Sequence, residues 1–298
     1  MTSSLSAAAN ARAAAEATFT TMQTAAAADP RPAIKVRKMD LRFAEATPER
    51  WFDDNAMLTA TLSALAVSFP AGERFFIASV RHFLPKVTDP SLREAVHAFI
   101  GQEAHHTKEH VAFNRFLAAK GLPVERMERF LTEGITRLQR ASSPEANLAR
   151  TAALEHFTAI LAGALLEHPE LLDTMPDEVA KLWAWHAIEE VEHRSVAFDV
   201  YQSCVGDEAL RRRMMAFVTV MFLAMNTMRS AVLFRAMGGL RDPRGAAKAL
   251  DTMWGRPGVF RKVIPQYLEY FREGFHPSQH DYGPAVERAK ARYLGDKA

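Results

Sequence analysis

The sequence has little cysteine: Cys204 is the single one among its 298 residues. One cysteine cannot form a disulfide within the chain, and it excludes metal or iron–sulfur sites built from four cysteines of one chain. The N-terminus also lacks the basic region and compact apolar core of a secretory signal. We therefore expect a reducing, cytoplasmic setting.

An excess of charge of one sign is also absent, because 37 basic and 35 acidic residues give a net charge of +2. Proteins that bind nucleic acid normally have a strongly basic domain or patch. Nucleic acid is therefore not an expected partner. The apolar fraction of 48% is ordinary for a chain that buries a substantial core.

Strand signals are scarce, and helix signals occur throughout the chain. Residues 1–33 form an Ala-rich, low-complexity segment that we predict to be a disordered tail. Residues 34–43 alternate in polarity and predict either a short edge strand or an extended arm. Residues 34–298 are then expected to form a single helical domain with a C-terminal helical extension.

Proline, glycine and capping residues divide this domain into expected helices. Pro70 is expected to end one helix and start the next, and Asp89 with Pro90 opens a long helix that Gly121 ends. The expected helices cover residues 55–68, 70–86, 90–120, 123–140, 144–168, 176–204, 207–236, 243–252 and 257–273.

Long hydrophobic runs are few, and the longest extends from Met214 to Met225 and continues past Arg229 to Phe234. The uninterrupted part is shorter than the roughly 20 residues of a membrane span. The longer version would place Arg229 at membrane depth. The run therefore favours a buried helix packed on the bundle, with a membrane-surface helix or a substrate entrance as alternatives.

Against this background, the sequence contains two Glu-x-x-His units, Glu103 with His106 and Glu190 with His193. Positions i and i+3 of a helix lie on one face, so both side chains of a unit can reach the same metal ion. Carboxylates can bridge two ions, while each neutral imidazole binds one.

Two isolated glutamates complete the pattern: Glu73 and Glu155 lie on other apolar segments. One Glu from each of two helices and Glu-x-x-His from each of the other two is how ferritin-like bundles hold two metal ions. The sequence therefore predicts an all-α, ferritin-like four-helix bundle with additional N- and C-terminal helices. Two metal ions are the expected cofactor, with iron favoured and manganese or zinc as alternatives.

Helical phase divides the histidines and glutamates near the two Glu-x-x-His units into two groups. His110 and His186 fall near the ligand stripes and are candidate extra ligands. Either could equally be an ordinary buried histidine. Four other residues project off the stripes and are assigned to the surface or to supporting the ligands: His105, Glu109, Glu189 and Glu192.

Simpler explanations exist for single elements of this pattern. Glu73, in the first turn of its expected helix, would be favoured there by the helix dipole alone. A metal-free helical scaffold with coincidental carboxylates is a further alternative. It would bury glutamates without counter-charge, which costs several kcal/mol or forces protonation.

The chain also resembles a bacterial family labelled "predicted metal-dependent hydrolase", which is similar to the ferritin-like superfamily. The resemblance covers nearly the whole chain after the tail and rests on the runs VRKMDLRF, SFPAGERFFIASVRHF, FIGQEAHHTKEHVAFN, LEHFTA, HAIEEVEHRSVAFDVY and PQYLEYFREGFHP. A more distant similarity, to di-iron arylamine N-oxygenases, rests on His186-x-x-x-Glu190-x-x-His193. It implies His186 as an additional iron ligand and leaves His110 unassigned.

The two resemblances imply different reactions. Hydrolytic dinuclear sites need a wet approach for a polar substrate. A bundle centre lined by Phe75, Phe76, Phe157 and Trp183 better suits O2 and an apolar or aromatic organic substrate. A di-iron oxidoreductase is therefore the working hypothesis, with Glu73, Glu103, His106, Glu155, Glu190 and His193 as the catalytic ligands.

The alternatives are a dinuclear zinc or manganese hydrolase and a ferritin-like protein that handles iron or peroxide. Expected partners are a small organic substrate and O2, and the sequence does not identify an electron donor. A homodimer and peripheral contact with a membrane are left open.

Overall fold

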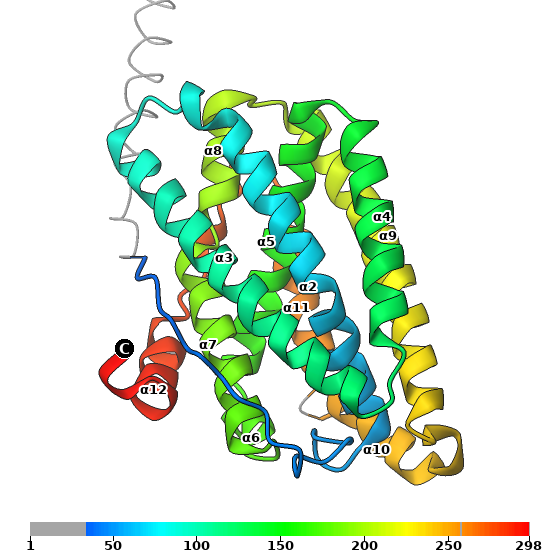
Figure 1. Cartoon of the computed structure of the whole chain (residues 1–298). Helices are drawn as coiled ribbons and strands as arrows, with labels where there is room; N and C mark the ends of the chain where they lie inside the picture. Colours follow the sequence, from blue (N-terminus) through cyan, green and yellow to red (C-terminus); the bar gives the residue numbers. More distant parts are fainter. Residues whose placement is uncertain (1–33, 257, 298) are drawn as a thin grey trace, which may run out of the picture. The chain divides into compact units, whose positions relative to one another are not determined.

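The computed structural model describes residues 34–256 and 258–297. Within these ranges the regular secondary structure consists of α-helices and short 3-10 turns, without a strand (Figure 1). The all-α prediction is confirmed. The predicted tail, residues 1–33, lies outside the described residues.

Four helices form the centre of the molecule: α2 (Ala56–Phe83), α3 (Pro90–Ala119), α5 (Pro144–Leu166) and α7 (Asp177–His193). Helix α2 packs on α3 and α5, and α7 packs on α5 and α3, which closes a four-helix bundle (Figure 1). Each of these helices contains at least one predicted ligand.

Capping side chains explain where these helices begin. The Asn55 side chain accepts hydrogen bonds from the backbone at the start of α2, and Asp89 and Ser143 do the same for α3 and α5. Each satisfies amide groups that have no partner within the helix. Gly121, with φ of 84°, follows the end of α3 in the left-handed region that glycine adopts easily.

The predicted break at Pro70 is wrong, because α2 continues through it. A proline inside a helix leaves the carbonyl four residues earlier without its donor. Here that carbonyl belongs to Ala66, and it accepts a hydrogen bond of 3.2 Å from Asn114 Nδ2 on α3. Glu73 consequently lies in the interior of a long helix, so the helix dipole does not explain its position.

The prediction of a single helix over residues 176–204 is also wrong, because the structure has two helices there. Helix α7 ends at His193, and α8 begins at Val196 after a short turn. The Arg194 side chain in this turn donates to the carbonyls of Val191, Pro277 and His280. These contacts satisfy one of the last carbonyls of α7 and fix the turn against the C-terminal segment.

The remaining helices surround the bundle: α4 (Val124–Arg140), α6 (Pro169–Leu172), α8 (Val196–Cys204), α9 (Glu208–Ala236), α10 (Pro243–Trp254), α11 (Val259–Glu269) and α12 (Gly283–Tyr293). The sequence did not predict α6 or α12. Helix α12 packs on α7 and α5 (Figure 1).

The interpretation of α9 as a buried helix is wrong. It packs on α2 and α5 through one stripe, in which its buried residues are Arg211, Met215, Val218, Arg229 and Leu233. In the described part of the chain it is the one helix long and apolar enough to cross a membrane, and only 17% of its apolar window is buried.

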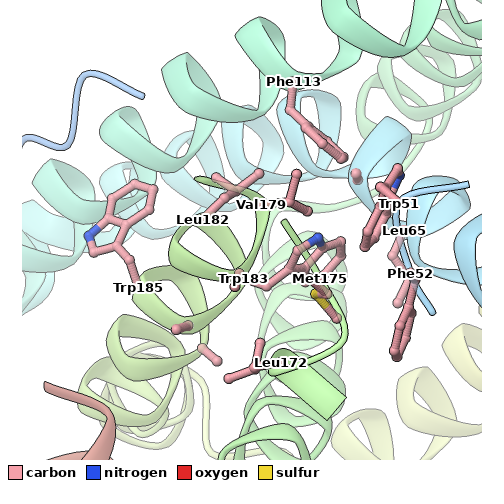
Figure 2. Packing of buried hydrophobic residues seen from close by; sticks show 14 of the residues in the cluster. Trp51, Phe52, Leu65, Phe113, Leu172, Met175, Val179, Leu182, Trp183 and Trp185 are labelled. Carbon is pink, nitrogen blue, oxygen red and sulfur yellow. The ribbon is translucent and has the colours of Figure 1, made fainter. Parts of the chain in front are cut away.

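A cluster of aromatic and aliphatic side chains fills the core beside α7. The rings of Trp51 and Trp183 are stacked with centroids 6.1 Å apart, and Phe113 lies edge-on to Trp51 (Figure 2). Trp185, further along α7, packs edge-on against His106. The apolar core therefore extends directly to the predicted ligands.

Residues 34–43 form an extended arm and not a strand. Burial alternates from Arg37 to Leu41, but it does not follow the predicted alternation in polarity throughout, because the apolar Val36 is exposed and the charged Arg37 is buried. The arm crosses α3 where Gly101 allows a close approach: a Cβ added there would lie 2.9 Å from Val36. The arm thereby reaches the residues that precede Glu103.

Candidate metal centre

The structure brings the six motif residues together in the middle of the bundle. Each is no more than 3% exposed: Glu73, Glu103, His106, Glu155, Glu190 and His193. Helices α2, α3, α5 and α7 each contribute to the cluster. The potential ligand atoms of these six residues and of His186 fall into three overlapping groups, and within each group the atoms lie within 4.8 Å of one another.

One group consists of Glu103, Glu155 and His193. His193 Nε2 lies 3.2 Å from Glu103 Oε1 and 3.3 Å from Glu155 Oε2. It also lies 3.5 Å from Glu190 Oε1. Three carboxylates and one imidazole nitrogen thus converge on one position.

The second position is defined by Glu73, His106 and His186, with Glu190 beside them. His106 Nδ1 lies 3.5 Å and His186 Nε2 3.0 Å from Glu190 Oε1. Because Glu190 also approaches His193, and Glu103 Oε1 lies 3.9 Å from His106 Nδ1, these two carboxylates lie between the positions. This is the arrangement expected of bridging ligands.

The two additional histidines, His110 and His186, have different positions relative to the ligand groups. His186 belongs to one of the ligand groups, whereas His110 belongs to none of them. His110 Nε2 instead lies 2.7 Å from His186 Nδ1. The His186 ring is stacked between His106 and Phe69, with centroid distances of 4.2 and 4.6 Å. His110 therefore orients His186 and leaves the other ring nitrogen of His186 facing Glu190.

Hydrogen bonds at the outer ring nitrogens orient the two motif histidines. His193 Nδ1 lies 2.8 Å from Gln102 Oε1, and His106 Nε2 lies 3.1 Å from Glu189 Oε2. Such partners fix the tautomer of a metal-binding histidine and direct its other nitrogen at the ion. The sequence did not identify Gln102, although it directly precedes Glu103.

The N-terminal arm supports these orienting residues. Arg37 is 4% exposed and donates to Glu189 and, through two nitrogens, to Glu192. Gln102 Nε2 donates to Glu192 and to the Lys35 carbonyl. Of the two roles considered for Glu189 and Glu192, surface or support, the structure shows support.

The other two residues assigned away from the ligand stripes differ from each other. Glu109 is buried and accepts hydrogen bonds from the backbone of Asp40 and Leu41, which attaches the arm to α3. His105 is partly exposed.

Burial changes the acidity of these side chains. Burial raises the pKa of Glu73 and Glu103 well above the usual value, and it raises the pKa of Glu155 to about 7. Burial also opposes charge on Glu190 and His193. Their mutual attraction nevertheless holds the pKa of Glu190 well below, and that of His193 well above, the ordinary values. Burial lowers the pKa of His106 and His110.

The donor atoms fit bound metal cations. Buried atoms without a hydrogen-bond partner in the described chain include Glu73 Oε1, both oxygens of Glu103 and Glu155, Glu190 Oε2, His106 Nδ1 and His193 Nε2. An unpaired buried polar atom costs about 1–3 kcal/mol, and more when it is charged. An oxygen-rich set with imidazoles suits iron, manganese or zinc.

An apolar pocket of about 100 Å³ reaches this cluster. His186 and Glu190 are part of its lining. Apart from these two residues and three threonines the lining is apolar, and it comes from α2, α5, α7, α9, α10 and α11 and from Phe52 and Leu171: Phe52, Leu58, Thr61, Leu62, Leu65, Phe69, Thr158, Leu161, Ala162, Leu165, Leu171, Trp183, Ala187, Phe222, Thr252, Met253, Val259 and Phe260.

Comparison with known proteins identifies one match. The family model described as "Predicted metal-dependent hydrolase" matches residues 35–281. This range includes every ligand candidate as well as Arg37 and Gln102. No curated protein and no solved structure matches.

Proposed function

The chain belongs to the family of predicted metal-dependent hydrolases, and from this premise we propose that it is a dinuclear metal enzyme that hydrolyses an apolar, ester-like substrate. The family match supports hydrolysis at a metal centre, and the apolar pocket that ends at His186 and Glu190 beside the buried ligand cluster supports an apolar substrate.

The ligands would divide between two ions. Glu155 and His193 would hold one, Glu73, His106 and His186 would hold the other, and Glu103 and Glu190 would bridge them. When bound, such a pair supplies Lewis-acid activation of water and of a carbonyl or phosphoryl oxygen. Iron, manganese and zinc all suit this ligand set.

The protein's own contribution is orientation and exclusion of water. Gln102 and Glu189 hold the imidazoles of His193 and His106, and Arg37 in turn holds Glu189. The pocket lining surrounds an apolar substrate segment and places its reactive group beside Glu190. Binding along the pocket would therefore position the bond to be cleaved.

A second candidate reaction is the O2-dependent oxidation of the same kind of substrate. Two observations favour it: the enclosed position of the carboxylate and imidazole ligands, and an approach lined almost wholly by apolar groups. It would require an electron donor.

One pair of assays separates the reactions. Metal-loaded protein is incubated with nitrophenyl esters of increasing chain length, with and without O2, and both product release and O2 consumption are recorded. Hydrolysis predicts release of nitrophenol under nitrogen, with a preference for longer chains. If nitrophenol is not released and O2 is consumed with an organic substrate and a reductant, the hydrolase proposal is wrong and oxidation is favoured.

Leu161→Trp tests the pocket itself. Leu161 lines the pocket but is not a ligand candidate. The larger side chain should raise KM for long-chain esters by about tenfold or more, since a few lost methylene contacts are worth 1–3 kcal/mol. KM for an acetyl ester and the metal content should remain unchanged. Equal effects on short and long esters would exclude this pocket as the substrate site.

A further inference from the structure

Exposed apolar side chains are concentrated on one part of the molecule. The described chain has fourteen large apolar residues that are exposed, and all but Val36, Phe130 and Leu138, eleven in total, lie between residues 217 and 268. Val220 is 68% and Leu223 56% exposed. Such a concentration of exposed apolar residues in one segment indicates a candidate interaction site.

On α9 these residues form a stripe. At 100° per residue, the exposed side chains of Phe217, Val220, Met221, Met228 and Val232 lie within about 120° of one another. Between Arg213 and Arg235 the one charged residue of α9 is Arg229, which is 5% exposed and belongs to the opposite, packed stripe. The outer face of α9 is therefore uncharged over most of its length.

Helix α11 contacts α9, and α10 contacts α11. Thr219 Oγ1 on α9 lies 3.0 Å from the Tyr267 hydroxyl on α11, and Trp254 packs edge-on against Phe260. The exposed residues Leu250, Trp254, Ile264 and Leu268 belong to these helices. We define the docking face as the exposed apolar residues of α9, α10 and α11 together with Leu240.

The same segment has an excess of positive charge. Residues 217–268 contain eight arginines and lysines and two acidic residues, Asp242 and Asp251, which gives +6. Since the whole chain has a net charge of +2, the rest of it must be −4. The exposed basic residues of the segment include Arg235, Arg241, Arg244, Arg256 and Arg261.

We propose that the docking face binds peripherally to the surface of an anionic lipid bilayer. The apolar side chains would enter the boundary between headgroups and acyl chains, and the basic residues would contact anionic headgroups. Each lysine or arginine near such a surface contributes about 1 kcal/mol. A second copy of the chain is a poorer occupant, because it would bring two +6 segments together.

Peripheral binding fits the packing of α9 better than insertion across the membrane. The inner stripe of α9 buries Met215, Val218 and Leu233 against the bundle. A membrane-spanning α9 would have to leave α2 and α5, which would expose this core and place Arg229 in hydrocarbon. The helix instead offers one face to the protein and one to lipid.

The docking face also adjoins the pocket. Phe222, Met253 and Phe260 line the pocket, and exposed residues of the docking face, Leu223 and Trp254, are their immediate neighbours on α9 and α10. This step rests on the proposed function. The adjacency indicates that the substrates are lipids or lipid-like molecules dissolved in the membrane. They would pass from the bilayer through the pocket to the ligand cluster.

Flotation of the full-length protein with vesicles tests docking without reference to activity. The vesicles consist of phosphatidylcholine alone or with about one third phosphatidylserine. We expect flotation with the anionic vesicles, little with the neutral ones, and release at high salt. Trp254 provides a second readout, because the other three tryptophans are at most 5% exposed, so its emission should shift to the blue on binding.

Two variants probe the two components of the face. Val220→Glu with Met228→Glu should lower partitioning to anionic vesicles by about tenfold or more, and so should Arg241→Glu with Arg244→Glu. Phe130→Glu is the matched control, because Phe130 is 63% exposed but lies on α4, outside the face. Thermal unfolding of each variant shows whether it is folded.

Wild-type protein that does not float with anionic vesicles would overturn the proposal. So would a dimer that Val220→Glu with Met228→Glu dissociates, because the face would then belong to a second copy. Failure of the ester assays with intact flotation would contradict the proposed function alone.

Discussion

At the scale of single residues, the cluster depends on groups that hold the ligands as well as on the ligands themselves. Gln102 contacts His193, and Glu189 contacts His106. In each histidine the contact is made by the ring nitrogen that points away from the cluster. The sequence could predict which glutamates and histidines converge, because helical phase places the two members of each Glu-x-x-His unit on one face. It could not predict Arg37, which comes from an arm about 150 residues before its partners.

The first prediction concerns Gln102→Leu, which keeps the size of the side chain but removes the hydrogen bond to His193. Metal affinity should fall by about 10–100-fold, as is typical when such a partner is lost. Competition with a chromophoric chelator measures the affinity. Gln139→Leu provides a control, because Gln139 lies on α4, which contributes no residue to the ligand groups. Unchanged affinity in Gln102→Leu would show that His193 needs no partner.

The second prediction concerns the pH dependence of the metal-free protein. Burial raises the pKa of Glu155 from 4.5 to about 7, so folding favours its protonated form. This contribution is fully present below about pH 4.5 and is lost as the pH rises through about 7. Its magnitude is about 3 kcal/mol at 1.36 kcal/mol per pKa unit.

Urea unfolding of chelator-treated protein from about pH 5 to pH 8 measures this loss. Relative to Glu155→Gln, the free energy of unfolding of the wild type should decline as the pH rises; the comparison removes the opposite contribution of the buried histidines His106 and His110, which both proteins share. Bound metal should reduce the decline, because it stabilises the ionised carboxylates. The same pH dependence in the metal-free wild type and in Glu155→Gln would contradict the assigned pKa.

At the scale of elements, α2 is the clearest example of tertiary structure overriding a local signal. Pro70 is a helix-breaking residue by its own chemistry, yet α2 continues because Asn114 on α3 supplies a donor to Ala66. The sequence predicted the starts of α3 and α5 correctly, because Asp89 and Ser143 cap them locally. It missed the break after His193, which depends on carbonyls of Pro277 and His280 in the C-terminal segment.

The third prediction follows from this compensation at Pro70. Asn114→Ala should lower the free energy of unfolding by about 1–3 kcal/mol, because it leaves the buried Ala66 carbonyl without a donor. In a Pro70→Ala background the cost should be smaller, since residue 70 then supplies its own N–H. A double-mutant cycle by urea unfolding measures the coupling. Equal costs in both backgrounds would show that the Asn114 contact does not compensate for Pro70.

At the scale of the whole molecule, a chain that belongs to a metal-dependent family folds into an all-α bundle, and this bundle buries a cluster of acidic and histidine side chains. Sequence periodicity could identify the four helices that contribute residues to the buried cluster. It misassigned α9, because an apolar helix looks the same in sequence whether its outer face meets protein, solvent or lipid. Burial of that face is decided by neighbours distant in the chain.

The fourth prediction is that metal binding stabilises the whole domain. The ligands come from four helices, so the folded protein binds the ions and the unfolded chain binds them weakly. Free metal at about 1,000 times its Kd should add about 4 kcal/mol. Differential scanning fluorimetry with Fe(II), Mn(II) and Zn(II) measures the rise in Tm. If none of these metals raises Tm above that of a magnesium control, the cluster does not couple metal binding to folding.

The central claim is that these residues hold two metal ions, and the metal content of protein purified without chelator tests it most directly. Elemental analysis by inductively coupled plasma mass spectrometry should give two metal ions per chain for the wild type. It should give the same content for Glu133→Ala, a control on the exposed surface of α4. Glu103→Ala and Glu190→Ala should each lose both ions, because each removes a carboxylate placed between the two positions. Full retention of metal in these two variants, or a wild type that binds none, would contradict the account.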